Sequence, residues 1–448
     1  MSATTMPREN VPVALINELD RLGKQHVDGT CKGMPPRVEA FALGEIGERG
    51  WNVLREDMAF PLAVIKQSAI ERNRRWMQAF LAFSGVRIAP HVKTSMSPHL
   101  FRTQLEDGAW ALTVATANQA AVLKRFGVDR ILIANQVVSR SNLEFLFGEL
   151  EAESGAELIV IVDSQAGLDA LIEAGRGRPL KRRLGLLLEV GAAGGRTGFR
   201  DMTAALALAR RIHEHADLFE LRGVESYESV FPALAEEEKQ SRIRAMLDSM
   251  LALASAIRDA GWFSSHEVVL SSGGSEYFDI VARRLSAWSA PQGAFVLIRS
   301  GCYLAHDHLA YARAFDRLLA RQDALRDIAP GLEGALEVWG VVQSRPEPET
   351  LIVTVGKRDI SFDFELPAAR LHFRPGRDVE PRPLTGEHRV VRLNDQHAFV
   401  HCHADADFAA GDLIAFGISH PCTTFDKWQV IPVVDDRYNV RSAIRTFF

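Results

Sequence analysis

Residues 158–163 read LIVIVD and residues 184–190 read LGLLLEV. Uninterrupted runs of Val, Ile and Leu such as these are typical of strands buried on both faces, as in a parallel sheet covered by helices. Similar β-rich runs occur on both sides of this stretch, and helix-forming segments such as 202–216 separate them. The further runs lie at 62–67, 87–93, 111–116, 130–135, 220–226, 266–272 and 294–300.

This alternation of strand and helix patterns predicts an α/β fold with a parallel sheet. Eight strand–helix units close a (β/α)8 barrel over roughly 250 residues. The runs number nine, so we assign 62–67 to a second domain and begin the barrel at residue 87. An open, doubly wound sheet of nine strands is the competing fold.

The pattern changes after about residue 320, where helical periodicity stops and short β-rich runs follow, separated by Pro, Gly, Asp and Asn turns. These runs predict a C-terminal antiparallel β domain. Near the N-terminus we expect a helix at about 11–25. The predicted domains are an N-terminal segment that partly joins the β domain, the barrel, and the C-terminal β domain, at residues 1–60, 61–318 and 319–448 respectively.

The composition is that of a globular protein, with 448 residues, 47% of them hydrophobic and 24% charged, and a formal net charge of -5. No basic face is evident that would bind nucleic acid. The apolar runs are far shorter than the roughly 20 residues that cross a bilayer, and Met1–Asn10 lacks an apolar signal core. We therefore expect a soluble, cytoplasmic protein without nucleic-acid or membrane partners.

The four cysteines are too widely spread over a long chain to predict a disulfide framework. Free thiols or a metal ligand are the expected roles. These cysteines are Cys31, Cys302, Cys402 and Cys422.

Lys93 lies in the segment APHVKTS (89–95), at the end of the predicted first barrel strand. A lysine at the C-terminal end of a barrel strand faces the side on which barrel active sites lie. A partly desolvated lysine amine can form a Schiff base with an aldehyde. A solvated lysine at a strand end is the alternative interpretation.

Two glycine-rich segments follow later strands and precede helical patterns. In SSGGSEYFD (271–279) the glycines allow close backbone approach, and Ser272 and Ser275 add hydroxyl donors near a helix N-terminus, which favours phosphate binding. In GAAGGRTGFRD (191–201), Arg196 offers a guanidinium fork to a ligand. The alternatives are a plain turn and a flexible surface loop. No Walker A or GxGxxG pattern points to a nucleotide.

His420 and Cys422 flank one proline in ISHPCTTFDKW (418–428). On a strand, residues i and i+2 face the same side, and imidazole with thiolate suits zinc. Two protein ligands leave coordination positions for water or substrate, which describes a catalytic metal site. The alternative is a strand-end histidine beside a buried cysteine. The cluster His401, Cys402, His403 is a weaker metal candidate, because alternation separates its middle member from the other two.

Together these segments resemble one family, the fold-type-III pyridoxal-phosphate enzymes that contain D-threonine aldolase and eukaryotic-type D-serine dehydratase. The resemblance covers about residues 60–435. It rests on motifs that follow in the family's order: APHVKT, the glycines leading to Arg-Thr-Gly, GVESY (223–227), SGGS, RSGCYLAHD (299–307) and the terminal HxC. It implies a barrel with a β domain, a homodimer, and pyridoxal 5'-phosphate bound at the C-terminal face of the barrel.

The resemblance also implies residue roles. Lys93 matches the Schiff-base lysine, and His420 with Cys422 matches the metal pair. The expected cofactor contacts are the phosphate loop, two positions that line the cofactor ring, and a strand-end segment, formed by Gly273, Gly274 and Ser275, by Arg196 and Tyr227, and by Tyr303 and Asp307. The family often has His-Lys directly after Lys-Thr, where this chain has Ser95 and Met96. The substrate side chain is therefore left open.

We expect a lyase that uses pyridoxal phosphate and a divalent metal, zinc before others, to dehydrate and deaminate a D-β-hydroxy amino acid. D-Serine, D-threonine and 3-hydroxyaspartate are candidate substrates, each giving a 2-oxo acid and ammonia. His-x-Cys resembles the family's dehydratases and His-x-Asp its aldolases. The runner-up is retro-aldol cleavage to glycine and an aldehyde, with His397 as the base. A racemase, a non-catalytic cofactor-binding protein and a metal-dependent sugar-phosphate barrel enzyme are further alternatives.

Overall fold

The computed structural model describes residues 11–153, 155–231, 234–264 and 267–448. The Met1–Asn10 segment and the start of the run at 266–272 lie outside these residues. The chain divides into two compact units, and each is described by itself. The first comprises residues up to Leu15 together with Phe80–Lys93 and Phe101–Gly301, and the second comprises Ile16–Ala79, Thr94–Leu100 and Cys302–Phe448.

The first unit contains eight parallel strands, and each pairs in register with its neighbours in the order β4-β11-β10-β9-β8-β7-β6-β5. A parallel bridge between His91 and Thr113 joins the chain after β4 to β5, so the sheet curls round on itself. The predicted α/β barrel is therefore confirmed. Its strands are β4 (Arg87–Ile88), β5 (Leu112–Val114), β6 (Arg130–Ile133), β7 (Glu157–Val162), β8 (Leu184–Val190), β9 (Phe219–Ser226), β10 (Val268–Ser271) and β11 (Ala294–Ile298).

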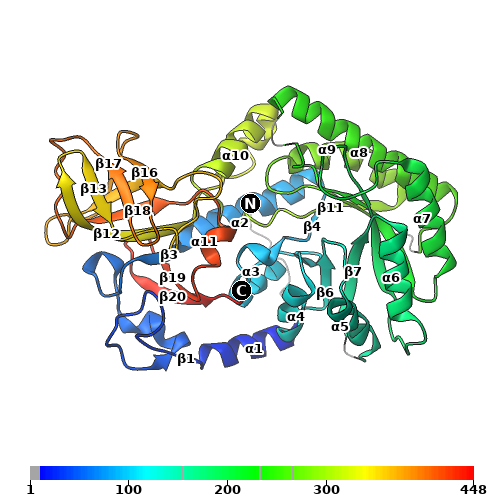
Figure 1. Ribbon diagram of the computed structural model, residues 1–448, viewed down its shortest axis with the longest axis horizontal. Coiled ribbons are helices and arrows are strands. Elements are labelled where there is room, and N and C mark those ends of the chain that lie inside the picture. The colour runs from blue at the N-terminus through cyan, green and yellow to red at the C-terminus, as the bar shows by residue number, and fades with distance from the viewer. Residues whose placement is uncertain (1–10, 154, 232–233, 265–266) are drawn as a thin grey trace, which may run out of the picture. The chain divides into compact units, whose positions relative to one another are not determined.

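Helices lie outside these strands, as Figure 1 shows for α5 to α8. Several begin at side chains that accept a hydrogen bond from a free amide of the first turn, such as Ser164 from Gly167 and Asp201 from Thr203. The helices are α4 (Ala117–Arg125), α5 (Arg140–Glu151), α6 (Gln165–Gly175), α7 (Met202–Glu214), α8 (Glu236–Asp259) and α9 (Phe278–Ser289). The barrel core is formed by Ala89, Ala111, Leu132, Ile159, Ile161, Leu187, Val269, Phe295 and Leu297.

The second unit is built on β12 (Leu336–Glu347), a long strand whose first half is buried. The run at 62–67 forms β3 (Leu62–Lys66), which pairs antiparallel with β12. The assignment of this run to the second domain is thus confirmed. β3 is almost completely buried, because it lies between β12 and β19.

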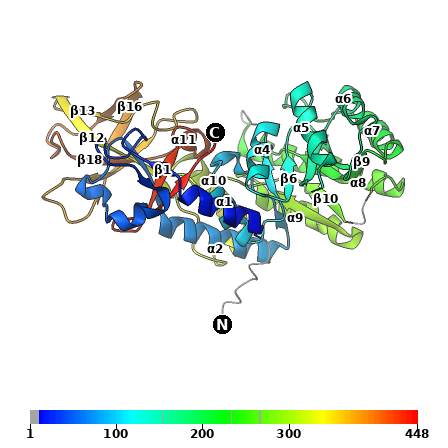
Figure 2. The same cartoon turned by 90° about the horizontal axis from the view of Figure 1, so that it is seen from below.

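Figure 2 shows β12, β13, β16 and β18 grouped in this unit. The predicted β domain is confirmed, but the sequence patterns missed β14 and β20, whose alternation of buried and exposed residues is irregular. The strands that accompany β3 and β12 are β13 (Thr350–Val353), β14 (Ala368–Phe373), β15 (Arg382–Pro383), β16 (Arg389–Leu393), β17 (Ala398–His401), β18 (Leu413–Gly417), β19 (Val430–Val434) and β20 (Val440–Arg445).

The remaining elements are short or connect the larger ones. The helix expected near 11–25 is present as α1 (Val13–Gly23), and the others are α2 (Gln67–Ser84), α3 (Pro98–Glu106), α10 (Ala310–Arg321), α11 (Cys422–Phe425), β1 (His26–Val27), β2 (Phe41–Ala42), and the 3-10 segments Leu43–Arg49, Val53–Arg55, Val92–Thr94, Ala290–Gln292 and Asp323–Leu325. None of the helices in the described ranges combines the length and the apolar character needed to span a bilayer.

Gly223 allows β9 to carry a bulge beside β8. Leu186 pairs with Leu221 and Leu187 pairs with Gly223, so Arg222 is the extra residue. A Cβ atom on Gly223 would lie 1.9 Å from the carbonyl oxygen of Val269 in β10. The strand can approach its neighbour only because this side chain is missing.

Gly223→Ala is expected to destabilise the protein by about 1–3 kcal/mol, the usual cost of overpacking, because the new methyl group meets backbone that cannot move aside. Chemical denaturation monitored by circular dichroism measures this loss. Gly148→Ala in α5 is the matched control, because its Cβ would meet nothing within 4 Å. The control is expected to be neutral or stabilising by up to about 1 kcal/mol. Equal stability of the two variants would contradict the account.

Candidate active site

Lys93 lies in a 3-10 turn (Val92–Thr94) and not at the end of a regular strand, so this part of the prediction was wrong. Regular pairing of β4 ends at Ile88, and Pro90 has no amide hydrogen to continue it. The lysine still follows the C-terminal end of a barrel strand, where barrel active sites lie. Its side chain is exposed and therefore accessible to a ligand.

The SSGGS loop between β10 and α9 directs two backbone amides at one carboxylate. The amides of Gly273 and Gly274 donate to the two oxygens of Glu228, at 3.1 and 2.7 Å. Gly273 adopts a left-handed conformation with φ of 92°, which a residue without Cβ adopts readily. The loop therefore has the backbone geometry of an anion-binding turn. The anion that its amides bind in this structure is the carboxylate of Glu228, which is fully buried. The sequence analysis missed Glu228, although it directly follows the GVESY motif.

Arg196 and Tyr227, which were expected to line the same ligand, are brought together. The Arg196 guanidinium lies over the Tyr227 ring at 5.2 Å from its centroid. The two residues come from different loops, after β8 and after β9. A cation over an aromatic face is held in orientation by the ring quadrupole, so the pair forms a polar wall at the C-terminal face of the barrel.

The loop that carries Arg196 is anchored and is not the flexible loop of the alternative interpretation. The hydroxyl of Thr197 donates to Glu189 at 2.7 Å, and the amide of Gly198 donates to Asp163 at 2.9 Å. Glu189 also accepts from Gln136 at 2.5 Å. These bonds tie the loop to the ends of three barrel strands.

A buried ion pair lies between β9 and the residue that follows β11. Arg299 is 2.9 Å from an oxygen of Glu225, but the contact lacks hydrogen-bond geometry and that oxygen has no other partner among the described groups. Burial raises the pKa of Glu225 to about 7, against the opposing effect of the Arg299 charge. Arg299 also donates to Ser271 and to the carbonyl of Ser226. This network fixes β9, β10 and β11 beneath their loops.

Three side chains meet in the second unit, and only one of them was a predicted site residue. The Sγ atoms of Cys302 and Cys422 are 3.8 Å apart. The hydroxyl of Thr94 is 3.7 Å from Cys302 and 3.4 Å from Cys422. Hydrogen bonds from Cys422 and then Thr94 lower the pKa of Cys302 to about 6, although burial opposes this. No local pattern identified Cys302, because 120 residues separate the two cysteines.

His420 and Cys422 do not lie on a strand, so the expected alternation was wrong. His420 lies in the turn after β18, and Cys422 begins the short helix α11. The backbone turns here because proline occupies the position between them. The Nδ1 atom of His420 is 2.6 Å from Asp363, and its ring stacks on Phe364 with 4.1 Å between centroids. A carboxylate on one nitrogen is the usual support of a metal-binding imidazole.

The other predicted site residues of the second unit, Asp307, Tyr303 and His397, make contacts that stabilise the fold. Asp307 accepts hydrogen bonds from the amides of Leu309, Tyr311 and Ala312 and so caps α10, while Tyr303 is buried. His397 lies in the turn between β16 and β17, where its carbonyl accepts from Asn394. The contacts of the described residues do not bring it to the His420 turn.

The weaker metal candidate follows the expected alternation. Cys402 is buried and approaches the carbonyl of Pro348, whereas His403 is exposed and pairs with Glu387. Within the described residues, no three His, Cys, Asp or Glu side chains are already arranged as a metal-holding group.

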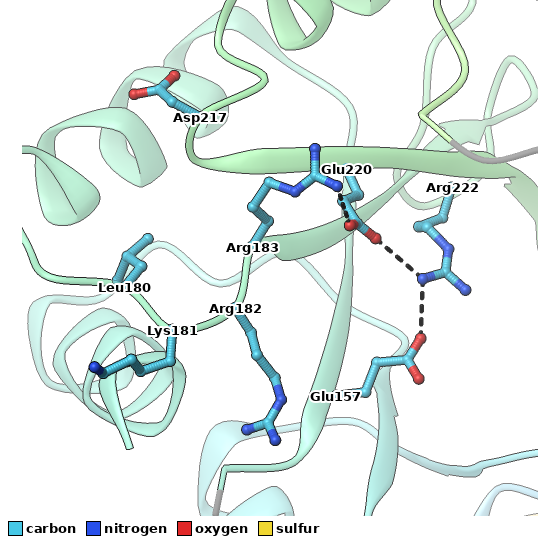
Figure 3. Close-up of a pocket in the computed structure, with 8 residues that line it drawn as sticks. All are labelled: Glu157, Leu180, Lys181, Arg182, Arg183, Asp217, Glu220 and Arg222. Atoms are coloured by element: carbon cyan, nitrogen blue, oxygen red, sulfur yellow. Dashed lines mark hydrogen bonds and ion pairs between the residues drawn. The ribbon is translucent and has the colours of Figure 1, made fainter. Parts of the chain in front are cut away.

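A cavity of about 450 Å³ lies at the opposite end of the barrel, where β7, β8 and β9 begin. Figure 3 shows its charged lining, in which Glu220 pairs with Arg183 and Arg222 and Glu157 pairs with Arg222. Barrel active sites lie at the other end, and the N-terminal ends of the strands serve stability. This cavity is therefore not the candidate active site.

Comparisons with known proteins agree with this architecture. The family described as "Alanine racemase, N-terminal domain" matches residues 65–283, and the family described as "Putative serine dehydratase domain" matches residues 335–434. The D-threo-3-hydroxyaspartate dehydratase of Delftia sp. (strain HT23) is 32% identical over 212 residues, which cover 45% of this chain and 52% of that protein. The match thus spans about half the length of this curated relative.

Solved structures share the fold over most of both chains. D-threonine aldolase from Filomicrobium marinum is 22% identical with a TM-score of 0.72, covering 89% of this chain and 97% of its own. The Delftia dehydratase structure is 21% identical with a TM-score of 0.67, covering 88% and 99%. A further structure, with a TM-score of 0.65 at 20% identity and coverage of 89% and 99%, is a cysteine-to-alanine variant of a D-threo-3-hydroxyaspartate dehydratase in the metal-free form.

The two domain matches cover the barrel and the β domain in the order in which the chain presents them. The resemblance found in the sequence motifs is thereby confirmed. The barrel therefore belongs to the alanine racemase N-terminal domain family, and the β domain belongs to the putative serine dehydratase domain family.

Proposed function

We propose that this protein is a lyase that dehydrates a D-amino acid with a β-hydroxyl group, using pyridoxal phosphate and a divalent metal, and that hydrolysis of the dehydrated product returns the water, so that the net products are a 2-oxo acid and ammonia. One observation carries the proposal. Lys93 is followed directly by Thr94, whose hydroxyl contacts both Cys302 and Cys422. The lysine that would hold the cofactor is thus adjacent in sequence to a residue that contacts both of these thiols.

The residues of the barrel fit the cofactor. Lys93 supplies an accessible amine for its aldehyde, Arg196 and Tyr227 offer a polar wall, and the loop of Gly273 and Gly274 has the form of an anion site. When bound, the cofactor withdraws electrons from the bonds at the substrate Cα. These contacts are predictions for this chain.

The residues around Cys422 fit a metal such as zinc, because thiolate and imidazole are ligands that zinc prefers. His420 is oriented by Asp363, as metal-binding imidazoles usually are. The metal-free structure of a cysteine-to-alanine variant of a D-threo-3-hydroxyaspartate dehydratase supports a metal role for a cysteine in the proposed site. The metal would supply Lewis acidity towards the β-hydroxyl group, which is otherwise a poor leaving group.

Lys93 is the group we assign to the Cα proton, because an amine released from the cofactor can act as a general base. Loss of the β-hydroxyl then gives an enamine that hydrolyses to a 2-oxo acid and ammonia. The curated relative that supports this reaction is named for a hydroxyaspartate, which supports 3-hydroxyaspartate among the candidate substrates already expected beside D-serine and D-threonine. Cys422, in place of the aspartate of the aldolase pattern, favours dehydration over retro-aldol cleavage.

Product identity tests the reaction. With D-threonine, dehydration is expected to give 2-oxobutyrate and ammonia, and D-serine is expected to give pyruvate, each detected by a dehydrogenase-coupled assay. Thorough removal of metal by a chelator should abolish turnover, and zinc should restore it, because the metal activates the leaving group. Glycine and acetaldehyde as products would establish the aldolase alternative. Full activity without metal would contradict the metal's role.

Lys93→Ala is expected to lose the yellow absorbance band of the lysine-bound cofactor and at least about 1,000-fold in kcat, because attachment site and base are removed together. Borohydride reduction of the unaltered protein followed by peptide mapping should label Lys93. Lys181→Ala, at the exposed opposite end of the barrel, is the control and should keep colour and activity. A label on another lysine would refute the assignment.

Glu228→Gln is expected to bind pyridoxal phosphate several-fold more tightly. The Glu228 carboxylate holds the two loop amides that the phosphate is expected to use, and like charges at one site repel. Titration of cofactor-free protein, followed by absorbance, measures the change in Kd, and the near-isosteric amide preserves the packing. Weaker binding would show instead that the charge of Glu228 is needed to shape the loop.

A further inference from the structure

Cys302 is a thiol beside the candidate metal pair, and the proposed function does not use it. It is 5% exposed and lies directly after the barrel strand β11 and Gly301. Its sulfur is 3.8 Å from that of Cys422, and the hydroxyl of Thr94 contacts both sulfurs. Two cysteines that are far apart in the chain are therefore held together at a defined separation.

That separation is the one that a shared zinc ion requires. Zinc binds thiolate at about 2.3 Å with tetrahedral angles, which places two sulfurs of one site about 3.8 Å apart. We propose that Cys302 is a third protein ligand of the metal, together with Cys422 and His420. The inference rests on the metal of the proposed function, and it concerns a residue outside the HxC pair.

The imidazole completes this set by a local rotation. The described residues contain no preformed group of three ligands, so the two sulfurs are in position and the ring is not. The Nδ1 atom of His420 is held by Asp363, and the amide of His420 is bonded to Ser361. Because Cys422 is only two residues away, we expect binding of the metal to reorient the ring towards the sulfurs, with Asp363 as its support.

The competing explanation is that the two thiols simply pack together through a weak S–H hydrogen bond, as buried cysteines often do. Two features favour the metal. Cys422 is only partly buried, so the pair borders accessible surface, and a histidine with a carboxylate partner adjoins it. The hydroxyl of Thr94 lies within 3.7 Å of both sulfurs and accepts a hydrogen bond from Cys422, so the cluster is polar and differs from the apolar packing of a buried cysteine.

A third ligand has chemical consequences. Two thiolates and one imidazole leave one tetrahedral position open, which is the ligand set and the open position of a catalytic zinc site. A second thiolate also strengthens the preference for zinc over magnesium or manganese, which favour oxygen ligands. The structure therefore predicts a zinc enzyme that does not accept magnesium in its place.

The inference is tested by measuring the zinc affinity of the full-length protein. The cofactor is bound and the thiols are kept reduced during the measurement. Competition with a chromophoric chelator gives Kd for the unaltered protein and for Cys302→Ser, Cys422→Ser and Cys402→Ser. Cys302→Ser is expected to weaken binding at least about tenfold, as Cys422→Ser does, because each removes a ligand. Cys402→Ser should have no effect, because that thiol lies at Pro348 in another part of the β domain.

X-ray absorption at the zinc edge is independent of variant folding and of activity. In the zinc-loaded protein it should show two sulfur neighbours at about 2.3 Å. One sulfur neighbour, or an unchanged Kd in a folded Cys302→Ser protein, would overturn the role of Cys302 and leave the HxC pair intact. Absence of zinc binding by the unaltered protein would instead refute the metal of the proposed function.

Discussion

The parallel direction of the barrel strands is the constraint on which the candidate site depends. All eight strands end on the same face, so segments distant in sequence present their following loops together. For this reason Lys93 after β4, Arg196 after β8, Tyr227 after β9 and the glycine loop after β10 all follow strand ends at the same face of the barrel. Hydrogen bonds between side chains and backbone then hold these loops, as Asp163 and Glu189 hold the loop of Arg196.

The residues beneath the loops of this face are polar and form hydrogen bonds and an ion pair with one another. The buried pair of Glu225 and Arg299 is an electrostatic cost that the barrel tolerates, because Arg299 also satisfies Ser271 and the carbonyl of Ser226. Glu228, three residues after Glu225, supplies a second carboxylate, which accepts hydrogen bonds from the glycine amides. The charged groups beneath the loops are thus positioned by β9, β10 and β11.

In the second unit, loops distant in sequence hold two cysteine sulfurs 3.8 Å apart. Thr94, Cys302 and Cys422 come from three separated parts of the chain. Asp363 orients His420 from a fourth. Each contact is weak alone, but the sheet built on β12 and β18 gives these loops a rigid base. The separation of the two sulfurs agrees with the proposed tetrahedral zinc site.

The sequence by itself determined the order and type of the main elements, because long apolar runs and helical periods are local properties. It also identified Lys93, the glycine loop and the HxC pair, since each is a contiguous motif. It misplaced Lys93 and the HxC pair on regular strands, because prolines at 90 and 421 change the local backbone in ways that alternation does not reveal.

Only the tertiary structure decided that Glu228 occupies the amides of the glycine loop, that Arg299 reaches Glu225, and that Cys302 lies beside Cys422. These contacts join residues between 45 and 120 positions apart. Their formation depends on which strands are neighbours and where each loop turns. Such information is a property of the folded backbone as a whole, and no local pattern of residues contains it.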